Sequence, residues 1–332
     1  MRIIAEIGNA NGDLGYALDA VDQFADAGVW AVKGQMYRAD TLTSKTAKPY
    51  GKHIKEPSTQ WEAFTRQLSR AQWTKVHEAA TDKGVLFFGS VFDLDAVDQA
   101  VFDDWPFIKL ASADITYLGL IESVAATGIP IIMSTGAATS TEIGRALRWA
   151  QNVEPDVDIT LMVCTLSYPA LHRDAHLARI GTMRRLFNHN VGYSDHTRDV
   201  DVSGRAFTGW DAWCVEKHVT LTPGKGGDHD FAVTPSQIRL LLNGDTRTDT
   251  VAVDGSPTIR ILECELAARR GARRSLHAAR GIRPGEQLTV DNVKVVRPGT
   301  GIDPWRLVEV LGLCVSQPVA EDQPIMRDIL TD

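Results

Sequence analysis

Short apolar runs rich in β-branched residues alternate with amphipathic runs over most of this chain. The apolar runs are typical of strands buried on both faces of a parallel sheet, and the amphipathic runs have the spacing of helices. Eight strand-like runs are expected, at residues 2–8, 30–35, 85–91, 107–112, 130–135, 159–164, 190–195 and 212–218. Eight such units in about 250 residues favour an α/β fold of the (β/α)8 or TIM-barrel type over an open doubly wound sheet.

Several classes of function are disfavoured by the same sequence. No strand-like run is followed by the glycine-rich motif of a dinucleotide-binding or P-loop protein. The net charge of −7 argues against a nucleic-acid partner. The apolar runs are far shorter than the ~20 residues that cross a bilayer, and the N-terminus lacks the pattern of a signal peptide. We therefore expect a cytoplasmic protein without nucleic-acid or membrane partners.

The composition changes in the last quarter of the chain. Residues 268–275, "ARRGARRS", are basic, and the residues that follow contain short strand-like runs separated by R-P-G turns. These features predict a compact β-rich module. We expect a barrel domain over 1–250, a linker over 251–271 and the small module over 272–332.

Polar residues end or follow almost every strand-like run. They include Glu6, Lys33, Gln35, Ser90, Lys109, Ser112, Ser134, Ser194 and Glu216. A lone serine at such a place is more often a helix cap, and the two lysines could form structural ion pairs with Glu6 or Glu216. Because the carboxyl ends of barrel strands meet at one mouth, the whole set favours a site for a phosphate or carboxylate anion.

Two histidines lie near the ends of the seventh and eighth strand-like runs. His196 and His218 have Asp195 and Glu216 beside them. Either histidine alone could be a solvated loop residue. Neighbouring strands are ~4.8 Å apart, and a metal ion with bonds of ~2.1 Å to nitrogen can bridge that gap. The pair therefore favours a divalent-metal site that leaves positions open for water and substrate.

Motifs along the whole chain resemble those of one enzyme family. They are "AEIGN", "AVKGQ", "KGVLFFGSVFD", "IKLASADI", "IIMSTGAAT", "CTLSYP", "GYSDHT", "EKHVTL" and "GGDHDF", and the stretch "RRSLHAARGIRPGEQLTVDNVKVVRPGTGI" resembles an antifreeze-like (SAF) domain. The chain resembles the sialic acid synthase (N-acetylneuraminate synthase) family. That resemblance implies a transferase that condenses phosphoenolpyruvate with an aldehyde such as N-acetylmannosamine to give a 2-keto-3-deoxy sugar acid and phosphate.

The resemblance also implies roles for individual residues. Phosphoenolpyruvate is expected to contact Lys33, Lys109, Ser90, Ser112, Ser134 and Ser194. A divalent metal, with Mn²⁺ expected and Mg²⁺ or Co²⁺ as alternatives, is expected on His196 and His218. The sugar is expected near Glu6, Gln35, Tyr168 and Asp228. Catalysis is expected to involve Glu6, Lys33, Lys109, His218 and Asp228.

A further implication of the resemblance concerns the SAF module. Arg297, which follows a strand-like run in "VVRPGTG", is expected on an exposed loop. In the resembling family this arginine enters the barrel of the partner subunit, so a homodimer with crossed SAF domains is expected. The planar guanidinium suits recognition of sugar oxygens.

Four positions depart from the pattern of the resembling family. Ala10 stands in the place of a histidine, Gly34 in the place of a bulky residue, Leu166 in the place of a polar contact, and Ala113 in the place of a glycine. These changes are interpreted as clustering on the sugar side and at one anion contact, which favours an altered acceptor.

Two other functions remain open. A metal-dependent aldolase or lyase could use pyruvate in the same pocket, but the set of anion-holding residues is larger than pyruvate needs. A non-catalytic sugar-binding protein could have lost the chemistry, but the retained histidine pair argues against it.

Overall fold

The computed structural model describes residues 1–50, 59–246 and 253–331. Eight strands form a closed barrel in chain order, each parallel to its neighbours, and the first strand pairs with the eighth. They are β1 (Ile3–Glu6), β2 (Ala31–Met36), β3 (Leu86–Val91), β4 (Ile108–Leu110), β5 (Ile131–Ser134), β6 (Ile159–Cys164), β7 (Asn190–Asp195) and β8 (Val215–His218). The prediction of a TIM barrel is confirmed.

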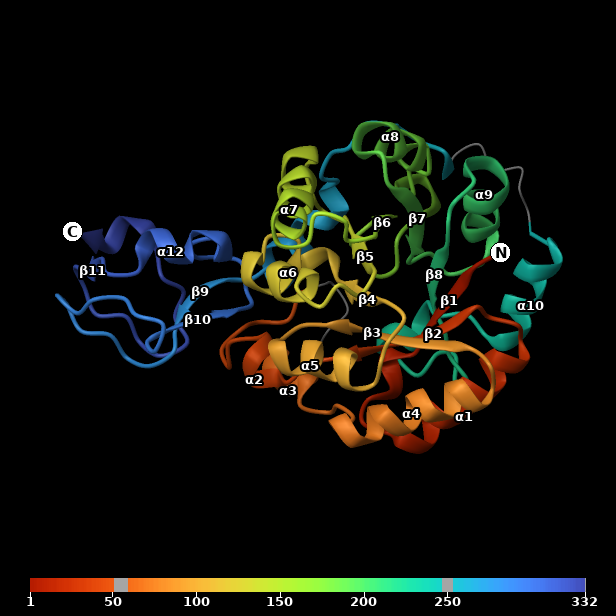
Figure 1. Ribbon diagram of the computed structural model, residues 1–332, viewed down its shortest axis with the longest axis horizontal. Coiled ribbons are helices and arrows are strands. Elements are labelled where there is room, and N and C mark those ends of the chain that lie inside the picture. Colours follow the sequence, from red (N-terminus) through yellow and green to blue (C-terminus); the bar gives the residue numbers. More distant parts are fainter. Residues whose placement is uncertain (51–58, 247–252, 332) are drawn as a thin grey trace.

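Helices surround the barrel and connect its strands (Figure 1). The longer ones are α1 (Leu14–Asp26), α4 (Arg70–Asp82), α5 (Leu94–Phe102), α6 (Leu118–Ala125), α7 (Ser140–Val153), α8 (Ala178–Phe187), α9 (Asp201–Trp210) and α10 (Pro235–Asn243), and α2 (Ala39–Leu42) and α3 (Gln60–Phe64) are short. Side-chain caps begin several of them; Ser69 and Thr139 each form a capping box, which satisfies amide donors at the helix start. No described helix is long and apolar enough to cross a membrane.

The wall of the barrel explains one departure from the family pattern. Gly34 lies in the middle of β2, and a Cβ atom at this position would lie only 2.6 Å from a ring carbon of Trp73 on α4. Trp73 is 2% exposed and belongs to the main core. Because successive strand residues face opposite sides, Gly34 faces the helices while Lys33 faces the inside. The interpretation of Gly34 as a sugar-side change is therefore wrong.

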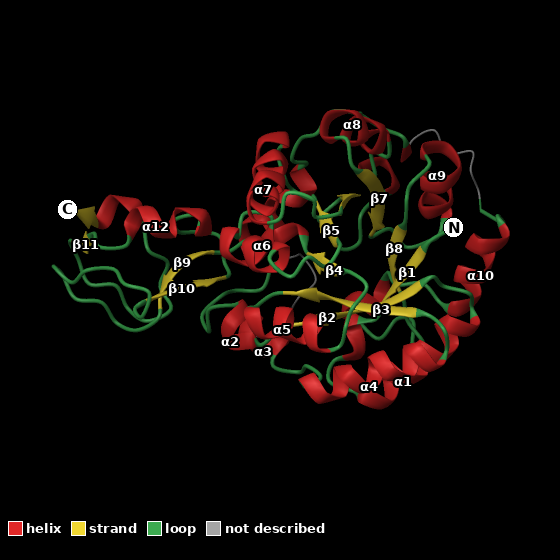
Figure 2. Cartoon of the chain, viewed as in Figure 1, coloured by secondary structure: helices red, strands yellow, loops and turns green. Residues whose placement is uncertain are grey.

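The C-terminal residues form a small β-rich module at one end of the molecule (Figures 1 and 2). It contains two antiparallel pairs, β9 (Ser275–Ala278) with β10 (Val293–Val296) and β11 (Cys314–Val315) with β12 (Leu330–Thr331), and the short helix α12 (Leu307–Val310). Buried residues such as Leu276, Val310 and Ile325 give the module a core separate from that of the barrel.

The segment between the two domains packs on the barrel. After residue 252 it contains a 3-10 turn, η6 (Glu263–Glu265), and the helix α11 (Leu266–Ala272). Arg269 and Arg273 on this segment pair with Glu142 at the start of α7, at 2.8 Å and 2.6 Å. Residues 247–252, where the barrel domain was expected to end and the linker to begin, lie outside the described residues.

Arg274 fastens the start of the SAF module to three barrel loops. Its Nε donates to Asp114 at 2.6 Å, and its terminal nitrogens donate to the carbonyl oxygens of Thr41 at 2.7 Å and Phe92 at 2.6 Å. A fourth, longer bond reaches Val295 of the module itself at 3.3 Å. The loops after β2, β3 and β4 therefore share one buried arginine.

Candidate active site

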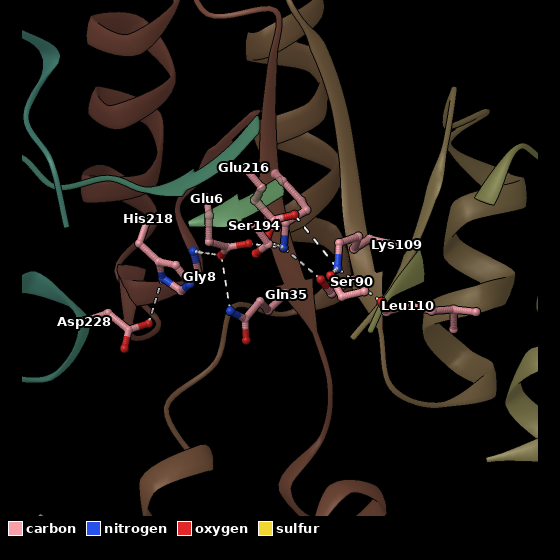
Figure 3. A network of polar contacts seen from close by, with 12 residues as sticks. Glu6, Gly8, Gln35, Ser90, Lys109, Leu110, Ser194, Glu216, His218 and Asp228 are labelled. Atoms are coloured by element: carbon pink, nitrogen blue, oxygen red, sulfur yellow. Dashed lines mark hydrogen bonds and ion pairs between the residues drawn. The ribbon is translucent and has the colours of Figure 1, made fainter. Parts of the chain in front are cut away.

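Polar side chains from several strands meet inside the barrel at its C-terminal end (Figure 3). The strand register explains the meeting, because residues paired across parallel strands point to the same side. Glu6 is level with both Lys33 and His218, Ser90 with Lys109, and Ser194 with Glu216. The expected residues at these strand ends therefore occupy one compact region.

Lys33 forms the first half of this cluster. Its side chain is almost fully buried; Nζ pairs with Glu6, donates to Ser90 Oγ at 2.8 Å and lies 3.6 Å from Glu216 Oε1. Burial lowers the pKa of Lys33, but the charges of Glu216 and Glu6 outweigh that effect and the net pKa is raised. Lys33 is therefore a buried, charged ammonium group.

Lys109 forms the second half. Its Nζ donates to Ser134 Oγ at 2.6 Å and to the Leu110 carbonyl at 3.1 Å, while Glu216 Oε2 lies 3.9 Å away. Burial and the nearby charge of Lys33 lower the pKa of Lys109. An anion placed beside Lys109 would be attracted to a cation that its own protein neutralises incompletely.

Glu216 is shared between the two lysines. Burial acts to raise its pKa, but Lys33 and Lys109 hold it at about 2. Its Oε2 has no hydrogen-bond partner among the described residues, and Ser194 Oγ donates to Oε1 over a long 3.5 Å. The structural ion pairs considered from the sequence do exist, but they leave bonding capacity unused.

The serine hydroxyls at this end of the barrel accept hydrogen bonds and can still donate one. Ser90 and Ser134 each accept a hydrogen bond from a lysine, and Ser112 accepts one from the Gly136 amide at 2.9 Å. A hydroxyl that accepts such a bond still has its own hydrogen to donate. None of these serines caps a described helix, so the simpler reading of them as caps is wrong.

The two histidines lie next to this cluster with their ring centroids 5.3 Å apart. His196 Nδ1 is 2.8 Å from the Thr165 carbonyl oxygen, so it carries a hydrogen and leaves Nε2 with a free lone pair. His218 Nδ1 lies 3.1 Å from Asp228 Oδ2. Burial and the neighbouring His218 lower the pKa of His196 to about 4, so its imidazole is neutral at physiological pH.

These features fit a divalent metal ion, although the part of the chain that the structure describes holds no complete ligand set. Neutral imidazole is a common metal ligand, and metal-binding histidines usually donate their other N–H to a carbonyl or carboxylate, as His196 does. His218 differs, since burial lowers its pKa but Asp228 raises it above its usual value. Within the described residues no group of three or more His, Cys, Asp or Glu side chains is arranged around a common centre.

Aromatic rings cover the histidine pair. The Tyr168 ring stacks 4.3 Å from the His196 ring, and the Phe231 ring lies 5.0 Å from the His218 ring. Tyr168 is 41% exposed whereas Phe231 is buried, so Tyr168 forms the outer surface of this cover. Phe231 was not expected as a site residue, although "GGDHDF" places it three positions after Asp228.

Asp195 lies on the other side of the barrel wall. It pairs with Lys217 at 3.1 Å and accepts a bond from Ser203 on α9 at 2.6 Å. Odd and even residues of β7 face opposite sides, so Ser194 points inward and Asp195 points toward the helices. The expectation that Asp195 supports the metal site is wrong.

Gln35 and Glu6 lie together near His218 (Figure 3). Gln35 Nε2 donates to Glu6 Oε1 at 3.3 Å, and the Gly8 amide donates to the same oxygen. The structure thus places Glu6 between the lysine cluster and the region where the sugar was expected. Asp228, on the turn η4 (Gly227–Asp230), approaches the same region from after β8.

Arg297 follows β10 of the C-terminal module, whereas the other expected site residues lie on the barrel domain. It is 6% exposed, so the prediction of an exposed loop is wrong. Its amide donates to the Leu42 carbonyl at 3.0 Å, and its carbonyl accepts from the Ser44 amide at 2.9 Å, both in the same chain. The guanidinium lies 5.4 Å from the Phe64 ring and 5.7 Å from the Phe92 ring, and Nε has no hydrogen-bond partner within residues 1–50, 59–246 and 253–331.

The other departures from the family pattern also have packing explanations. Leu166 packs with Ala137, Ala268 and Tyr50, so its side chain meets the linker helix. Ala10 is buried in the main core. An altered acceptor therefore does not follow from these two changes alone.

Comparisons with known proteins identify the family of this chain. The sequence pattern of the NeuB family matches residues 20–256, and that of the SAF domain matches residues 273–330. The chain belongs to the NeuB family. The predicted family and the SAF module are therefore confirmed.

Several named relatives of this NeuB-family chain are synthases. N,N'-diacetyllegionaminic acid synthase of Legionella pneumophila is 32% identical over 93% of this chain and 89% of its own length. Human N-acetylneuraminate-9-phosphate synthase is 28% identical over 99% of this chain and 92% of its own. The prediction of an enzyme in the class of C–C bond-forming sugar-acid synthases is confirmed.

A solved structure supports the arrangement of the whole NeuB-family chain. The spore coat polysaccharide biosynthesis protein SpsE of Bacillus subtilis aligns with 100% of this chain and 95% of its own, with a TM-score of 0.84 and 26% identity. The fold similarity therefore extends through both domains.

Proposed function

We propose that this NeuB-family enzyme condenses phosphoenolpyruvate with an aldose or related aldehyde and releases phosphate and a sialic-acid-like 2-keto-3-deoxy sugar acid. The observation that carries the proposal is the cluster of Lys33, Lys109 and serine hydroxyls at the mouth of the barrel. A substrate with both a phosphate and a carboxylate needs several cationic and hydroxyl donors in one place. The names of two relatives, N,N'-diacetyllegionaminic acid synthase and N-acetylneuraminate-9-phosphate synthase, support the class of product.

The lysines and serines bind phosphoenolpyruvate in this proposal. Lys33 and Lys109 offset the charges of its phosphate and carboxylate, and Ser90, Ser134 and Ser112 donate hydrogen bonds through their hydroxyl groups. Preorganised donors of this kind stabilise charge that develops in the transition state. Ser194, which holds Glu216 only loosely, completes this set of donors.

The reaction forms one carbon–carbon bond and breaks one carbon–oxygen bond. C3 of phosphoenolpyruvate attacks the aldehyde carbon, and the aldehyde oxygen takes a proton. Water then adds at C2, and the bond from C2 to the phosphate oxygen breaks to leave a ketone and phosphate. Glu6 and Asp228, with Gln35 and Tyr168 beside them, hold the attacking water and the sugar hydroxyls.

A divalent metal ion is part of the proposal, with Mn²⁺ expected and Mg²⁺ or Co²⁺ as alternatives. His196 and His218 hold it through the ring nitrogens that point away from Thr165 and Asp228. When bound, such an ion polarises the aldehyde oxygen of the acceptor. Phe231 and Tyr168 cover the histidines and limit the access of water.

The proposal includes a homodimer. Two arrangements of this dimer are considered, and they differ in which barrel Arg297 contacts. In the form implied by the family resemblance, Arg297 serves the barrel of the partner subunit. The contacts of Arg297 with Leu42 and Ser44 support a second form, in which it serves its own barrel. Chains carrying His218→Ala and chains carrying Arg297→Ala, mixed under proven subunit exchange, separate the two forms. If Arg297 acts in the partner's barrel, random pairing restores about a quarter of the active sites. If Arg297 acts in the barrel of its own chain, the mixture restores none.

The central experiment measures phosphate release. The enzyme is incubated with phosphoenolpyruvate, Mn²⁺ and a panel of aldehydes that includes N-acetylmannosamine and diacetylated amino sugars. We expect phosphate release that requires both substrates and stops reversibly with EDTA. If no aldehyde supports release, but pyruvate and an aldehyde condense, the enzyme is an aldolase or lyase and the proposal fails. If it binds sugars without turnover of either donor, it is a non-catalytic binding protein.

A further inference from the structure

A buried carboxylate of the linker contacts the catalytic end of the barrel without facing the mouth. Glu265, the last residue of η6, is 0% exposed. Its Oε1 accepts hydrogen bonds from the amides of Ala137 at 2.7 Å and Leu166 at 3.0 Å, and its Oε2 accepts one from Leu262 at 2.8 Å. The first two amides belong to the loops after β5 and β6. A carboxyl group that accepts three main-chain hydrogen bonds is well satisfied, so it holds these loops in place.

The bond to Leu166 leads directly to the histidine pair. The Leu166 amide and the Thr165 carbonyl are two ends of one peptide unit, and that carbonyl accepts the hydrogen of His196 Nδ1 at 2.8 Å. The Ser167 amide also donates to it, at 2.8 Å. A carboxylate bound to the N–H end of a peptide polarises the unit and strengthens its carbonyl as an acceptor. Glu265 is thereby coupled to His196 through one peptide bond.

A competing partner makes this coupling consequential. Cys164 Sγ lies 3.8 Å from the same ring nitrogen. If the thiol donated to Nδ1, His196 would carry its hydrogen on Nε2, and that nitrogen could no longer bind a metal ion. The tautomer of His196 therefore depends on whether the Thr165 carbonyl is the stronger partner.

The bond to Ala137 supports the serine side of the mouth. Ala137 has a left-handed backbone, with φ of 51°, which is unfavourable for a residue with a side chain. Its amide is held by Glu265, and its carbonyl accepts from Arg273 at 2.9 Å and also from Arg269. The preceding residue, Gly136, donates its amide to Ser112. The linker thus holds the strained turn that orients one of the expected substrate-binding serines.

We infer that Glu265 is a positioning residue that fixes the metal-binding tautomer of His196 and the loop of Ser112, and so makes both depend on the docked linker. This inference rests on the proposed function, because it concerns the proposed metal site. The linker thereby positions residues of the proposed metal site and of the proposed substrate site.

The test replaces the charge and keeps the shape. Glu265→Gln is compared with Glu263→Gln, which removes an exposed carboxylate from the same turn. Nitrogen-15 NMR of the histidine rings, without metal, reads the tautomer; calorimetry with Mn²⁺ alone reads affinity; amide exchange reads the order of Ala137 and Leu166. We expect a shift of His196 toward the Nε2–H form, about tenfold weaker Mn²⁺ binding and faster exchange at both amides only in Glu265→Gln.

Two further variants sharpen the result. Adding Cys164→Ala to Glu265→Gln removes the competing thiol, so it should return His196 toward the Nδ1–H form and restore part of the Mn²⁺ affinity. Glu265→Asp keeps the charge with a shorter reach and serves if Glu265→Gln does not fold. Faster exchange with an unchanged tautomer and unchanged Mn²⁺ affinity would overturn the inference and make Glu265 a structural brace. A wild-type enzyme that binds no Mn²⁺ would instead count against the proposed function, while the tautomer readout still tests the role of Glu265.

Discussion

The mouth of the barrel and its junction with the linker bury charged groups equally deeply but satisfy them differently. Lys109 and Arg274 are both 2% exposed. Arg274 has one short bond to Asp114 and short bonds to two carbonyl oxygens of neighbouring loops. Lys109 has two short bonds, to a hydroxyl and a carbonyl, and its nearest carboxylate oxygen is 3.9 Å away.

The difference separates structural charges from charges that await a ligand. A buried charge whose donors are filled by the protein holds elements together, and a ligand cannot improve its bonding. A buried charge with capacity to spare is stabilised further when an anion arrives, which is the condition for binding. On this criterion Arg274 belongs to the architecture of the two domains, and Lys109 has the property expected of a residue that binds an anion.

The largest expected effect comes from replacing Arg274, the buried arginine of the junction. Arg274→Met leaves Asp114 buried without its cation, and we expect a loss of about 3–5 kcal/mol in the free energy of unfolding. The matched control is Arg280→Met, which removes the more exposed pair with Glu286 and should change the stability little. Urea unfolding measures both. Equal stability of the two variants would show that burial at the junction has no structural role.

Removing the lysine of the mouth should have the opposite signature. Lys109→Met is expected to lower kcat/KM. The loss should correspond to about 2–3 kcal/mol of transition-state stabilisation, the scale of a lost hydrogen bond to a charged group. Its free energy of unfolding should change little, because Lys33 still pairs with Glu216. Steady-state kinetics with phosphoenolpyruvate and the same urea titration provide the measurement. A variant that is destabilised but catalytically normal would place Lys109 with the structural charges.

Gly34 lies on β2 but faces the surrounding helices, away from the mouth. Gly34→Ala drives a methyl group into the Trp73 ring, and overpacking of this kind costs about 1–3 kcal/mol of stability. Because the position faces the helices, the ranking of acceptor aldehydes should stay the same. Thermal unfolding and the aldehyde panel test the two halves of this expectation. A changed acceptor ranking at unchanged stability would return Gly34 to the sugar side.

The smallest expected effect is the dependence of the junction on pH. Burial acts to raise the pKa of Glu142, but the bond to Arg269 and the charge of Arg273 lower it to about 2 from an ordinary 4.5. A carboxyl with a lowered folded pKa contributes stability that is full above pH 4.5 and is lost as the pH falls toward 2. Wild type should therefore lose about 1 kcal/mol more than Glu142→Gln between these pH values, since Arg269 is partly exposed. Parallel unfolding curves across this range would show that the pair contributes nothing.

Much of this molecule was predictable from patterns that alternate with a fixed period. The order of strands and helices predicted the barrel, and the position of Glu6, Lys33 and Lys109 at strand ends predicted that they would meet. The same alternation explains the wrong expectation for Asp195. Its neighbour Ser194 faces the inside of the barrel, so Asp195 must face the helices. Attention to the alternation within β7 would have excluded it.

Contacts made through the main chain were not predictable. Glu265 and Arg274 bind amides and carbonyls of distant loops, and every residue type has those groups, so no motif marks the partner. The burial of Arg297 depends in the same way on the backbone of Leu42 and Ser44. Phe231 is an intermediate case, since its distance from Asp228 in the sequence is short but its direction is set by the turn.

Because the segment from Glu263 to Arg274 is bonded to loops from β2 to β6, the two domains of this enzyme are not freely exchangeable parts. A chimera that joins this barrel to the SAF module of a relative near residue 250 would pair foreign arginines with native loops. A joint after Arg274 would keep the contacts of this segment, so the foreign module would have to supply only the contacts of Arg297 and Asp322 with residues 42–44. In protein engineering, the boundary of recombination should therefore lie at the end of the linker, where the chain has already returned to the barrel.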